Sequence, residues 1–226
     1  TRRMDAQRGK QLRYLRMMKT RADVERSLDE LGALSNVKEY SMAISAWGRA
    51  GEHERAFAVL EEMEARGVSP NAVSFGAAIS ACKPRGLWEK ALALLEEATS
   101  RGLEPDVIAY SSAISVCETA GQWERAVSLL YEMPGRGLQP NVYSFSSAIS
   151  ACEKAGQSDR ALLLFQEMLS RGIEPDEISY ATAISACGRG GKSQQALEIK
   201  RARSRMHVRG AWYKFNWKKV SMLRKF

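Results

Sequence analysis

An amide or a carboxylate follows proline four times along this chain, at a constant step of 35 residues. Asn both donates and accepts hydrogen bonds, whereas an ionised Asp only accepts them, so such a series can discriminate between ligand groups. Both residues also favour the position before a helix, where a side-chain oxygen accepts a backbone N–H. The four sites are Pro70-Asn71, Pro105-Asp106, Pro140-Asn141 and Pro175-Asp176.

Few other residues offer reactive chemistry. His53 and His207 lie far apart without neighbouring metal ligands, which argues against a histidine metal site or a catalytic triad. The cysteines keep the 35-residue step, and the sequence contains no Cys-x-x-Cys. We therefore expect buried, reduced core residues, which weakly indicate a reducing compartment, rather than a metal site or disulfides. They are Cys82, Cys117, Cys152 and Cys187, and we expect no cofactor.

The elements that place these residues repeat with the same step. Each unit predicts a first helix that begins near an aromatic residue and ends at a glycine, followed by a second helix with one apolar stripe. Pro84 should shorten the first helix of the second unit, and Pro134 the second helix of the third. The aromatic residues and the glycines each recur every 35 residues; they are Tyr40, Phe75, Tyr110, Phe145 and Tyr180, and Gly51, Gly86, Gly121, Gly156 and Gly191.

One helix pair cannot bury both of its faces, so neighbouring pairs must stack. The sequence therefore predicts an all-α protein, an α-solenoid of 35-residue helix-turn-helix repeats coiled as a right-handed superhelix. Residues 1–36 are interpreted as a degenerate N-terminal helical cap. The array spans residues 37–199, as units 37–71, 72–106, 107–141, 142–176 and a partial unit 177–199.

Charge is distributed unevenly along the 226 residues, whose net charge is +8. Residues 1–36 carry +4, residues 37–199 carry −6 and residues 200–226 carry +10. A polyanion would be attracted to the ends of the chain, whereas the array would need locally placed cations. No stretch approaches the ~18 apolar residues of a membrane-spanning helix. The sequence begins at Thr1, which indicates a fragment or processed form whose targeting segment can be missing.

The repeat resembles the pentatricopeptide repeat family. The stretch "VYSFSSAISACEKAGQSDRALLLFQEMLSRGIEPD" follows that family's pattern of an aromatic residue, Ile, Gly, Ala, Glu-Met and a closing Gly-x-x-Pro-Asn/Asp. The resemblance covers residues 37–199, and the related tetratricopeptide repeat lacks this closure. It implies a protein that binds single-stranded RNA, one nucleotide per repeat. It also implies work in a mitochondrion or chloroplast, in RNA processing, stability or translation.

The family pattern assigns base reading to the residue after the aromatic and to the Asn or Asp that closes the same repeat. Asp suits the ring N–H of G or U, and Asn can donate to the bare ring nitrogen of A or C. The implied preference is 5′-A-(G/U)-A-G-3′. The pairs are Ser41 with Asn71 for A, Gly76 with Asp106 for G or U, Ser111 with Asn141 for A and Ser146 with Asp176 for G, while Ala181 has no closing partner.

Two further sets follow from the resemblance. Phosphate contacts would come from Arg49, Lys154 and Arg189 near the ends of first helices, while Pro84 and Thr119 interrupt this track. The residue two before each aromatic would form a wall for base stacking; these wall residues are Lys38, Val73, Ile108, Tyr143 and Ile178. Residues 200–226 either cap the stack with their aromatic residues or form a basic arm that stacks on bases; the aromatics are Trp212, Tyr213, Phe215 and Trp217.

Simpler roles remain open for the same residues. The reading serines (Ser41, Ser111 and Ser146) can be N-cap hydroxyls, and the closing residues (Asn71, Asp106, Asn141 and Asp176) can be caps alone. The alternative function is a protein-interaction scaffold or a structural component of a ribonucleoprotein, which the −6 charge of the array favours. We expect no enzymatic activity, because the sequence has no His-x-Glu with Cys-x-x-Cys. The expected partners are single-stranded RNA and other RNA-processing proteins, without membrane contact, and the chain itself is expected to be a monomer.

Overall fold

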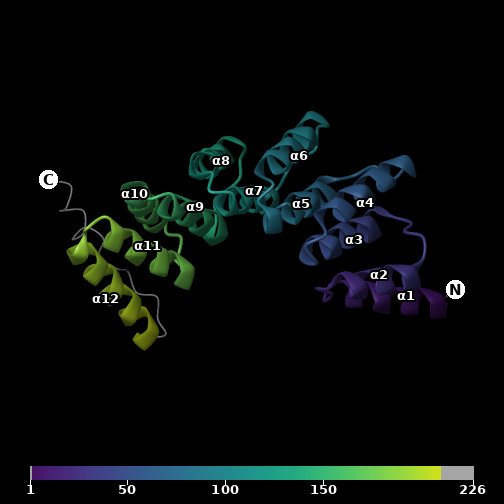
Figure 1. Cartoon of the computed structure of the whole chain (residues 1–226), viewed down its shortest axis with the longest axis horizontal. Helices are drawn as coiled ribbons and strands as arrows, with labels where there is room; N and C mark the ends of the chain where they lie inside the picture. Colours follow the sequence, from purple (N-terminus) through teal and green to yellow (C-terminus); the bar gives the residue numbers. More distant parts are fainter. Residues whose placement is uncertain (1, 210–226) are drawn as a thin grey trace. The chain divides into compact units, whose positions relative to one another are not determined.

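The computed structural model describes residues 2–209, and every element of secondary structure in this range is helical (Figure 1). None of these helices has the length and apolar character that a membrane crossing requires. Two helices, α1 (Arg2–Leu15) and α2 (Arg21–Leu31), precede the array. The first helices of the five repeats are α3 (Val37–Arg49), α5 (Ala72–Ala81), α7 (Val107–Thr119), α9 (Val142–Lys154) and α11 (Glu177–Arg189). The second helices are α4 (His53–Ala65), α6 (Trp88–Ser100), α8 (Trp123–Gly135), α10 (Ser158–Ser170) and α12 (Ser193–Arg209).

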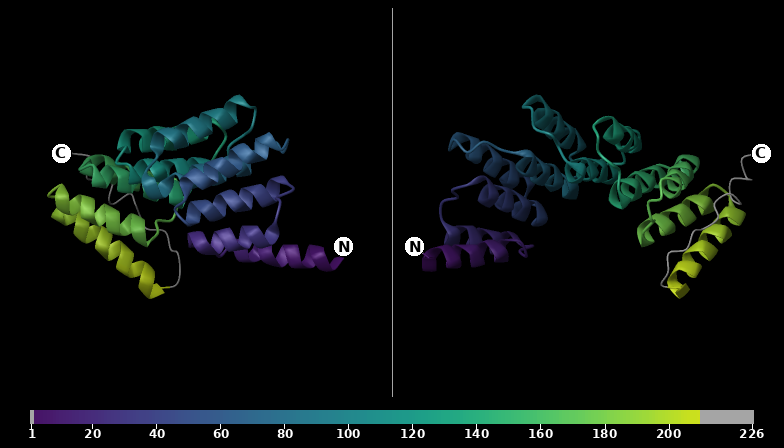
Figure 2. Two further views of the ribbon diagram at one scale, coloured as in Figure 1. Left: turned by 45° about the vertical axis from the view of Figure 1, so that its right-hand side comes forward. Right: turned by 180° about the vertical axis from the view of Figure 1, so that it is seen from behind.

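The chain divides into two compact units, the first ending at Pro140 and the second beginning at Asn141. In the first unit, α3 packs against α5 and α5 against α7, while α4, α6 and α8 each pack against the first helix of their own repeat. In the second unit, α9 packs against α11, and α10 packs against both (Figure 2). This stacking buries faces that a lone hairpin would leave exposed, and it confirms the predicted all-α repeat fold.

In three repeats an arginine at the end of the second helix covers the ring of the buried aromatic residue. The guanidinium of Arg136 lies 5.7 Å from the centre of the Tyr110 ring and pairs with Glu132, one turn earlier, at 2.6 Å. A cation over an aromatic face is attracted by the electrons of the ring. The same arrangement recurs as Arg101 over Phe75 at 5.4 Å and Arg171 over Phe145 at 5.8 Å.

The four cysteines lie in the last turn or at the C-cap of the first helices of the second to fifth repeats, where all are free and buried. Burial raises the pKa of Cys82 to about 12 and the pKa of Cys117 and Cys152 to about 11, because a thiolate would lose its hydration. These residues therefore pack as small apolar side chains. Among residues 2–209, no group of three or more His, Cys, Asp or Glu side chains is placed to hold a metal ion.

The two prolines that depart from the repeat pattern have different effects. Pro84 lies in a 3₁₀ turn, Lys83–Arg85, and the helix before it has 10 residues instead of the 13 of α3, which confirms the predicted shortening. Pro134 does not shorten α8, which keeps 13 residues, so that prediction is wrong. In the last turn a proline forfeits only one hydrogen bond. The helix end is still closed, because the Leu138 N–H donates to Met133 O at 2.9 Å.

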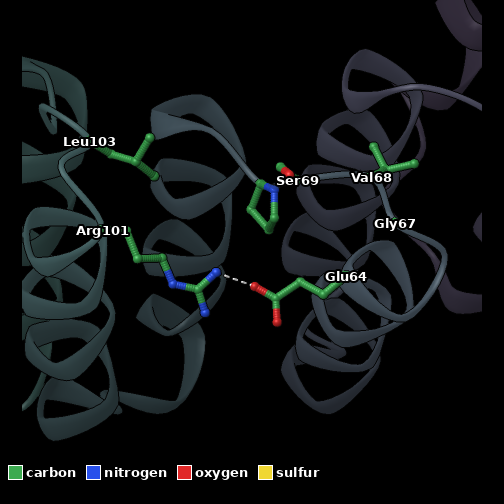
Figure 3. A pocket seen from close by; sticks show the side chains of 7 residues that line it. Glu64, Gly67, Val68, Ser69, Arg101 and Leu103 are labelled. Carbon is green, nitrogen blue, oxygen red and sulfur yellow. Dashed lines mark hydrogen bonds and ion pairs between the residues drawn. The ribbon is translucent and has the colours of Figure 1, made fainter.

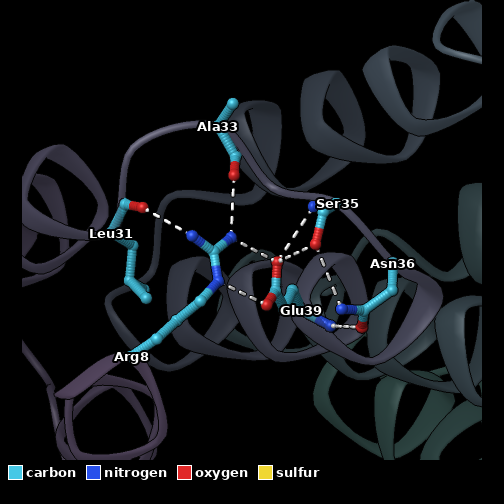
Figure 4. A network of polar contacts seen from close by, with 6 residues as sticks. All are labelled: Arg8, Leu31, Ala33, Ser35, Asn36 and Glu39. Atoms are coloured by element: carbon cyan, nitrogen blue, oxygen red, sulfur yellow. Dashed lines mark hydrogen bonds and ion pairs between the residues drawn. The ribbon is translucent and has the colours of Figure 1, made fainter. Parts of the chain in front are cut away.

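An ion-pair network joins the N-terminal helices to the first repeat (Figure 4). Arg8 on α1 donates to both carboxylate oxygens of Glu39 on α3, at 2.7 and 2.6 Å. It also donates to the carbonyls of Leu31 and Ala33, at 3.0 and 2.8 Å. The hydrogen bond from Arg8 outweighs the effect of burial, and the pKa of Glu39 falls to about 2. The network thus links α1 and α2 to α3. Both helices lie within residues 1–36, the segment that the sequence predicts to be a degenerate helical cap.

The last described helix, α12, runs from Ser193 to Arg209 without interruption. The boundary expected between residues 199 and 200 is therefore not an end of secondary structure, because no Gly-x-x-Pro follows there to stop the helix. Arg203 of α12 pairs with Glu177 at the start of α11, which ties the helix to its own repeat. The aromatic residues predicted to cap the stack or to bind bases, Trp212, Tyr213, Phe215 and Trp217, lie outside the described residues.

Candidate nucleic-acid interface

Each closing residue of the array lies at the N-terminus of a first helix. One side-chain oxygen accepts the backbone N–H three residues later, which confirms the capping role. The distances are 3.0 Å for Asn71, 2.9 Å for Asp106 and Asn141 and 2.8 Å for Asp176. The cap uses Oδ1 alone, so the amide nitrogen of each asparagine and the second oxygen of each aspartate are not needed for it. All four side chains are exposed except that of Asp176, which is half-buried.

The reading serines are buried, with exposed fractions of 6% for Ser41, 2% for Ser111 and 5% for Ser146. None of them is an N-cap, since each lies in the second turn of its helix, so the interpretation as capping hydroxyls is wrong. Ser41 and Ser146 are buried where the next first helix of the same unit approaches closely, with oxygen–oxygen distances of 2.9 Å to Ser74 and 2.6 Å to Ser179. A base approaching the first helices would therefore meet the closing residues before the serines.

In the first unit, a serine of the next repeat links a reading serine to its closing residue. Ser41 Oγ donates to the carbonyl of Val37 at 2.8 Å and lies 2.9 Å from Ser74 Oγ. Ser74 Oγ in turn donates to Asn71 Oδ1 at 3.2 Å. The structure thus brings the predicted pair Ser41 and Asn71 together through the hydroxyl of Ser74.

In the second unit the corresponding pair is in direct contact. Ser146 Oγ donates to Asp176 Oδ1 at 3.0 Å and lies 2.6 Å from Ser179 Oγ. The remaining pair, Ser111 and Asn141, is divided between the two units. The buried Ser111 hydroxyl has no hydrogen-bond partner among the residues that the structure describes.

The two other predicted reading positions carry no polar side chain. Gly76 is buried, and a Cβ at this position would meet the Cβ of Ala109 at 3.8 Å, an ordinary van der Waals contact. Ala181 is exposed on α11. In the second repeat this leaves Asp106 as the polar group of the predicted pair.

The wall residues are exposed in the first turn of the first helices, two positions after a closing residue. Single exposed apolar side chains are common on proteins. Here, however, large apolar side chains occupy the same place in four successive repeats, each beside a helix cap. The exposed fractions are 62% for Val73, 68% for Ile108, 46% for Tyr143 and 61% for Ile178, and Lys38 is exposed as well.

Two of the arginines predicted to contact phosphate also join their first helix to an earlier helix, a role that sequence reasoning missed. Arg49 donates to the carbonyl of Leu15, the last residue of α1, at 2.8 Å. Arg189 donates to the carbonyl of Glu153 at 2.9 Å and lies 3.2 Å from its carboxylate. A cation here complements the negative end of the preceding helix. Because a guanidinium has five N–H donors, phosphate contact by these arginines, like that by Lys154, stays a prediction.

The structure adds two cations to the predicted phosphate track. Pro84 occupies the expected cationic position of the second repeat, but Lys83 and Arg85 on either side of it are exposed in the 3₁₀ turn. The register position itself carries no charge, as the sequence predicts, and these two neighbours are the cations nearest to it along the chain. At the other interruption, Thr119 donates to the carbonyl of Ser115 at 3.0 Å and supplies no charge. A search one residue to either side of the register would have found both cations.

An open groove of about 470 Å³ lies in the first unit, beside the turn that closes the first repeat (Figure 3). Residues 67–69 line one side, and Leu103 lies on the other. Glu64 and Arg101, the ionisable residues of this lining, pair with each other. The groove offers no further ionisable group, and we assign it no catalytic role.

Comparisons with known proteins identify the repeat. A family model described as the pentacotripeptide-repeat region of PRORP matches residues 88–211, more than half of the chain. A second model, the PPR repeat family, matches residues 35–84. No curated protein matches the chain. The chain belongs to the pentatricopeptide repeat family.

Solved structures of this family have the same fold. The chain is similar to the pentatricopeptide repeat protein PPR10 from maize, with 29% identity and a TM-score of 0.65 over 89% of this chain and 29% of that chain. For PPR10 in complex with an 18-nt psaJ RNA element, the values are 26% identity and a TM-score of 0.66, over 89% and 33%. The chain thus spans about a third of PPR10 or less. The PPR domain of Arabidopsis thaliana protein-only RNase P 1 in complex with tRNA matches with a TM-score of 0.66 at 15% identity, over 85% of this chain and 100% of that chain, which shows the fold alone.

Proposed function

We propose that this chain binds single-stranded RNA along the first helices of its repeats. The observation that carries the proposal is a series of four wall residues, each an exposed apolar side chain beside a closing residue whose second hydrogen-bonding atom the cap does not use; they are Val73, Ile108, Tyr143 and Ile178. An unpaired base presents the matching features, two apolar faces and a hydrogen-bonding edge. The similarity to PPR10, whose structure contains an RNA element, supports the same conclusion.

A base of the second repeat would stack between Val73 and Ile108, with Asp106 at its edge. Stacking on an aromatic platform contributes ~1–3 kcal/mol per base, and aliphatic walls should give less. The second oxygen of Asp106 can accept only, which favours the ring N–H of G or U. The amide nitrogen of Asn71 can donate, which favours the bare ring nitrogen of A or C.

Extended to every repeat, this chemistry gives one nucleotide per repeat and the preference 5′-A-(G/U)-A-G-3′, with the N-terminus of the protein toward the 5′ end of the RNA. The array itself carries −6, so affinity depends on a few local cations and should be modest. Lys83, Arg85 and Lys154 supply such cations near the ends of first helices. Binding of this kind weakens as salt rises, because RNA releases bound counterions on association.

Within a cell we propose an organellar role in RNA processing, stability or translation, as the family resemblance implies. The role would be one of binding rather than catalysis, since the sequence lacks the His-x-Glu and Cys-x-x-Cys motif of appended deaminase-like domains. The alternative is a protein-interaction scaffold within a ribonucleoprotein. The negative charge of the array and the burial of the reading serines favour that alternative.

Selection of bound RNA from a random pool tests the proposal. It should be run with the full chain and with a chain ending at Arg209, which keeps α12 intact. Enrichment of A-rich or AGAG-containing strands by both chains would support reading by the repeats. Enrichment that disappears without residues 210–226 would assign binding to the basic C-terminal segment instead. Recovery of proteins but no RNA would support the scaffold.

A further inference from the structure

In two repeats the third residue of the first helix contacts both groups that the proposed function assigns to a base. From the second to the fifth repeat this residue is serine three times, here called the junction serines (Ser74, Ser144 and Ser179), and alanine once, Ala109, whereas the first repeat has Glu39. Ser74 and Ser179 each lie within hydrogen-bond distance of the reading serine of the preceding repeat and of the closing oxygen. The junction serines themselves are fully buried, so no base can reach them.

The second unit shows the consequence most directly. Ser179 Oγ donates to Asp176 Oδ1 at 2.6 Å and lies 2.6 Å from Ser146 Oγ. Two hydroxyl oxygens this close need a proton between them. Either Ser146 donates to Ser179, or Ser179 donates to Ser146 and Ser146 then donates to Asp176. In both arrangements the single proton of Ser146 is used inside the junction, and its lone pairs alone remain for a base.

The first unit follows the same rule. Ser41 Oγ has two acceptors inside the protein, the carbonyl of Val37 at 2.8 Å and Ser74 Oγ at 2.9 Å. Its proton is again directed away from the surface. Ser74 also holds the oxygen of Asn71 at 3.2 Å, which leaves the amide nitrogen of Asn71 as the outward group.

The sequence pairs these positions consistently. A residue 33 positions after each reading position belongs to the next repeat, and the pairs are Ser41 with Ser74, Gly76 with Ala109, Ser111 with Ser144 and Ser146 with Ser179. Wherever the reading residue has a hydroxyl, the junction residue has one, and where the reading residue has none, the junction residue has none. This pattern is expected if the two hydroxyls act together, as the contacts of Ser41 with Ser74 and of Ser146 with Ser179 show.

We infer that the junction serine is a positioning residue for base recognition: it holds the reading serine of the preceding repeat as a hydrogen-bond acceptor and fixes which side-chain atom of the closing residue faces outward. The inference rests on the proposed function. An acceptor at this place favours bases with an exocyclic amine, which A and G both carry and U lacks. The junction serine therefore determines specificity without touching RNA.

Removal of one junction serine tests this role. Ser179→Ala should lower the preference for G over U at the fourth base by roughly three- to tenfold, the ratio that corresponds to one lost hydrogen bond, while preferences at the first three bases stay unchanged. Ser74→Ala is the matched variant and should act at the first base alone. Kd values for oligonucleotides that differ only at one base give these ratios, and circular dichroism monitors folding. An equal loss at every base, or no change in any ratio, would overturn the inference.

Installation of the pair where the chain lacks it is the stronger test, because it asks for a gain. A Cβ at Gly76 has room beside Ala109, so Gly76→Ser should fold. Gly76→Ser combined with Ala109→Ser should prefer G over U at the second base more strongly than Gly76→Ser alone. Equal preferences in the two variants would contradict the inference even though RNA is bound. Absence of RNA binding by the unmodified chain would instead remove the proposed function, and this role with it.

Discussion

Replacement of Asp176 by Asn changes one atom that the proposed function places at the edge of a base, while it keeps the helix cap. Oδ1 of this residue accepts the Ser179 N–H at 2.8 Å and the hydroxyls of Ser179 and Ser146 at 2.6 and 3.0 Å. An asparagine oxygen can accept the same three bonds, and Asn caps helices as well as Asp does. The lost charge near the helix N-terminus should lower the free energy of unfolding by only about 0.3–1 kcal/mol.

The effect on base preference should be larger than the effect on folding. The second oxygen of Asp176, an acceptor, becomes an amide nitrogen, a donor. The hydrogen bond between a carboxylate and the ring N–H of G is worth about 1.5–3 kcal/mol. At 1.4 kcal/mol per tenfold, its loss lowers affinity for G at the fourth base by roughly ten- to a hundredfold. Affinity for A at the same base should rise, because the new donor meets the bare ring nitrogen of A.

Fluorescence anisotropy with two labelled oligonucleotides, one containing AGAG and one AGAA between identical flanks, measures the change. Asp106→Asn is the control, since the same chemical change two repeats earlier should alter preference at the second base alone. If Asp176→Asn leaves the ratio of the two Kd values unchanged while circular dichroism shows an intact array, this closing residue does not read a base.

Three other outcomes are expected. Arg8→Met should lower the free energy of unfolding at pH 7 by about 1–3 kcal/mol in urea titrations, because the buried Glu39 carboxylate loses its partner. The lowered pKa of Glu39, about 2, means that the unmodified chain keeps this stability above the ordinary pKa of 4.5 and loses it as pH falls toward 2, a loss that the variant should not show. Gly48→Ala should lower thermal stability, since the new Cβ would lie 2.9 Å from a Cβ of α5, whereas Gly188→Ala, at the same repeat position with open space, should not. Substitution of glutamine for both cations of the Lys83–Arg85 turn should weaken RNA binding and reduce the slope of log Kd against log salt by about 1.4, the value for two phosphate contacts with a single strand.

The repeat fold could be predicted from the sequence because its determinants are local. A proline followed by Asn or Asp, a glycine after each helix and an apolar stripe all act within one turn or one hairpin, and they recur with one step. The wall residues were predicted for the same reason: a fixed offset from the aromatic residue places them on the first turn. The superhelical hand and the base preference stay predictions.

What the sequence did not predict depends on contacts between repeats. The side of the helix on which Ser41 lies can be predicted from the sequence. Its burial cannot, because it depends on how closely the next first helix packs. The carbonyl that Arg49 reaches belongs to a helix more than 30 residues earlier, which no local pattern indicates. The cations beside Pro84 were missed because the 35-residue repeat points to one position only. In the structure both neighbours of that position, Lys83 and Arg85, are exposed in the 3₁₀ turn.

Because each closing side chain also caps the next helix, the proposed base reading would allow only a few substitutions at these four sites. Only Asn, Asp, Ser, Thr and Gly begin helices well, and an Ala there would cost about 1 kcal/mol of stability. Under the proposed function, a change of RNA target should therefore occur mainly through exchanges between Asn and Asp at the closing positions. Each such exchange keeps the helix cap, so every intermediate sequence still folds. The need to cap a helix therefore restricts the residue types that evolution can place at the closing positions.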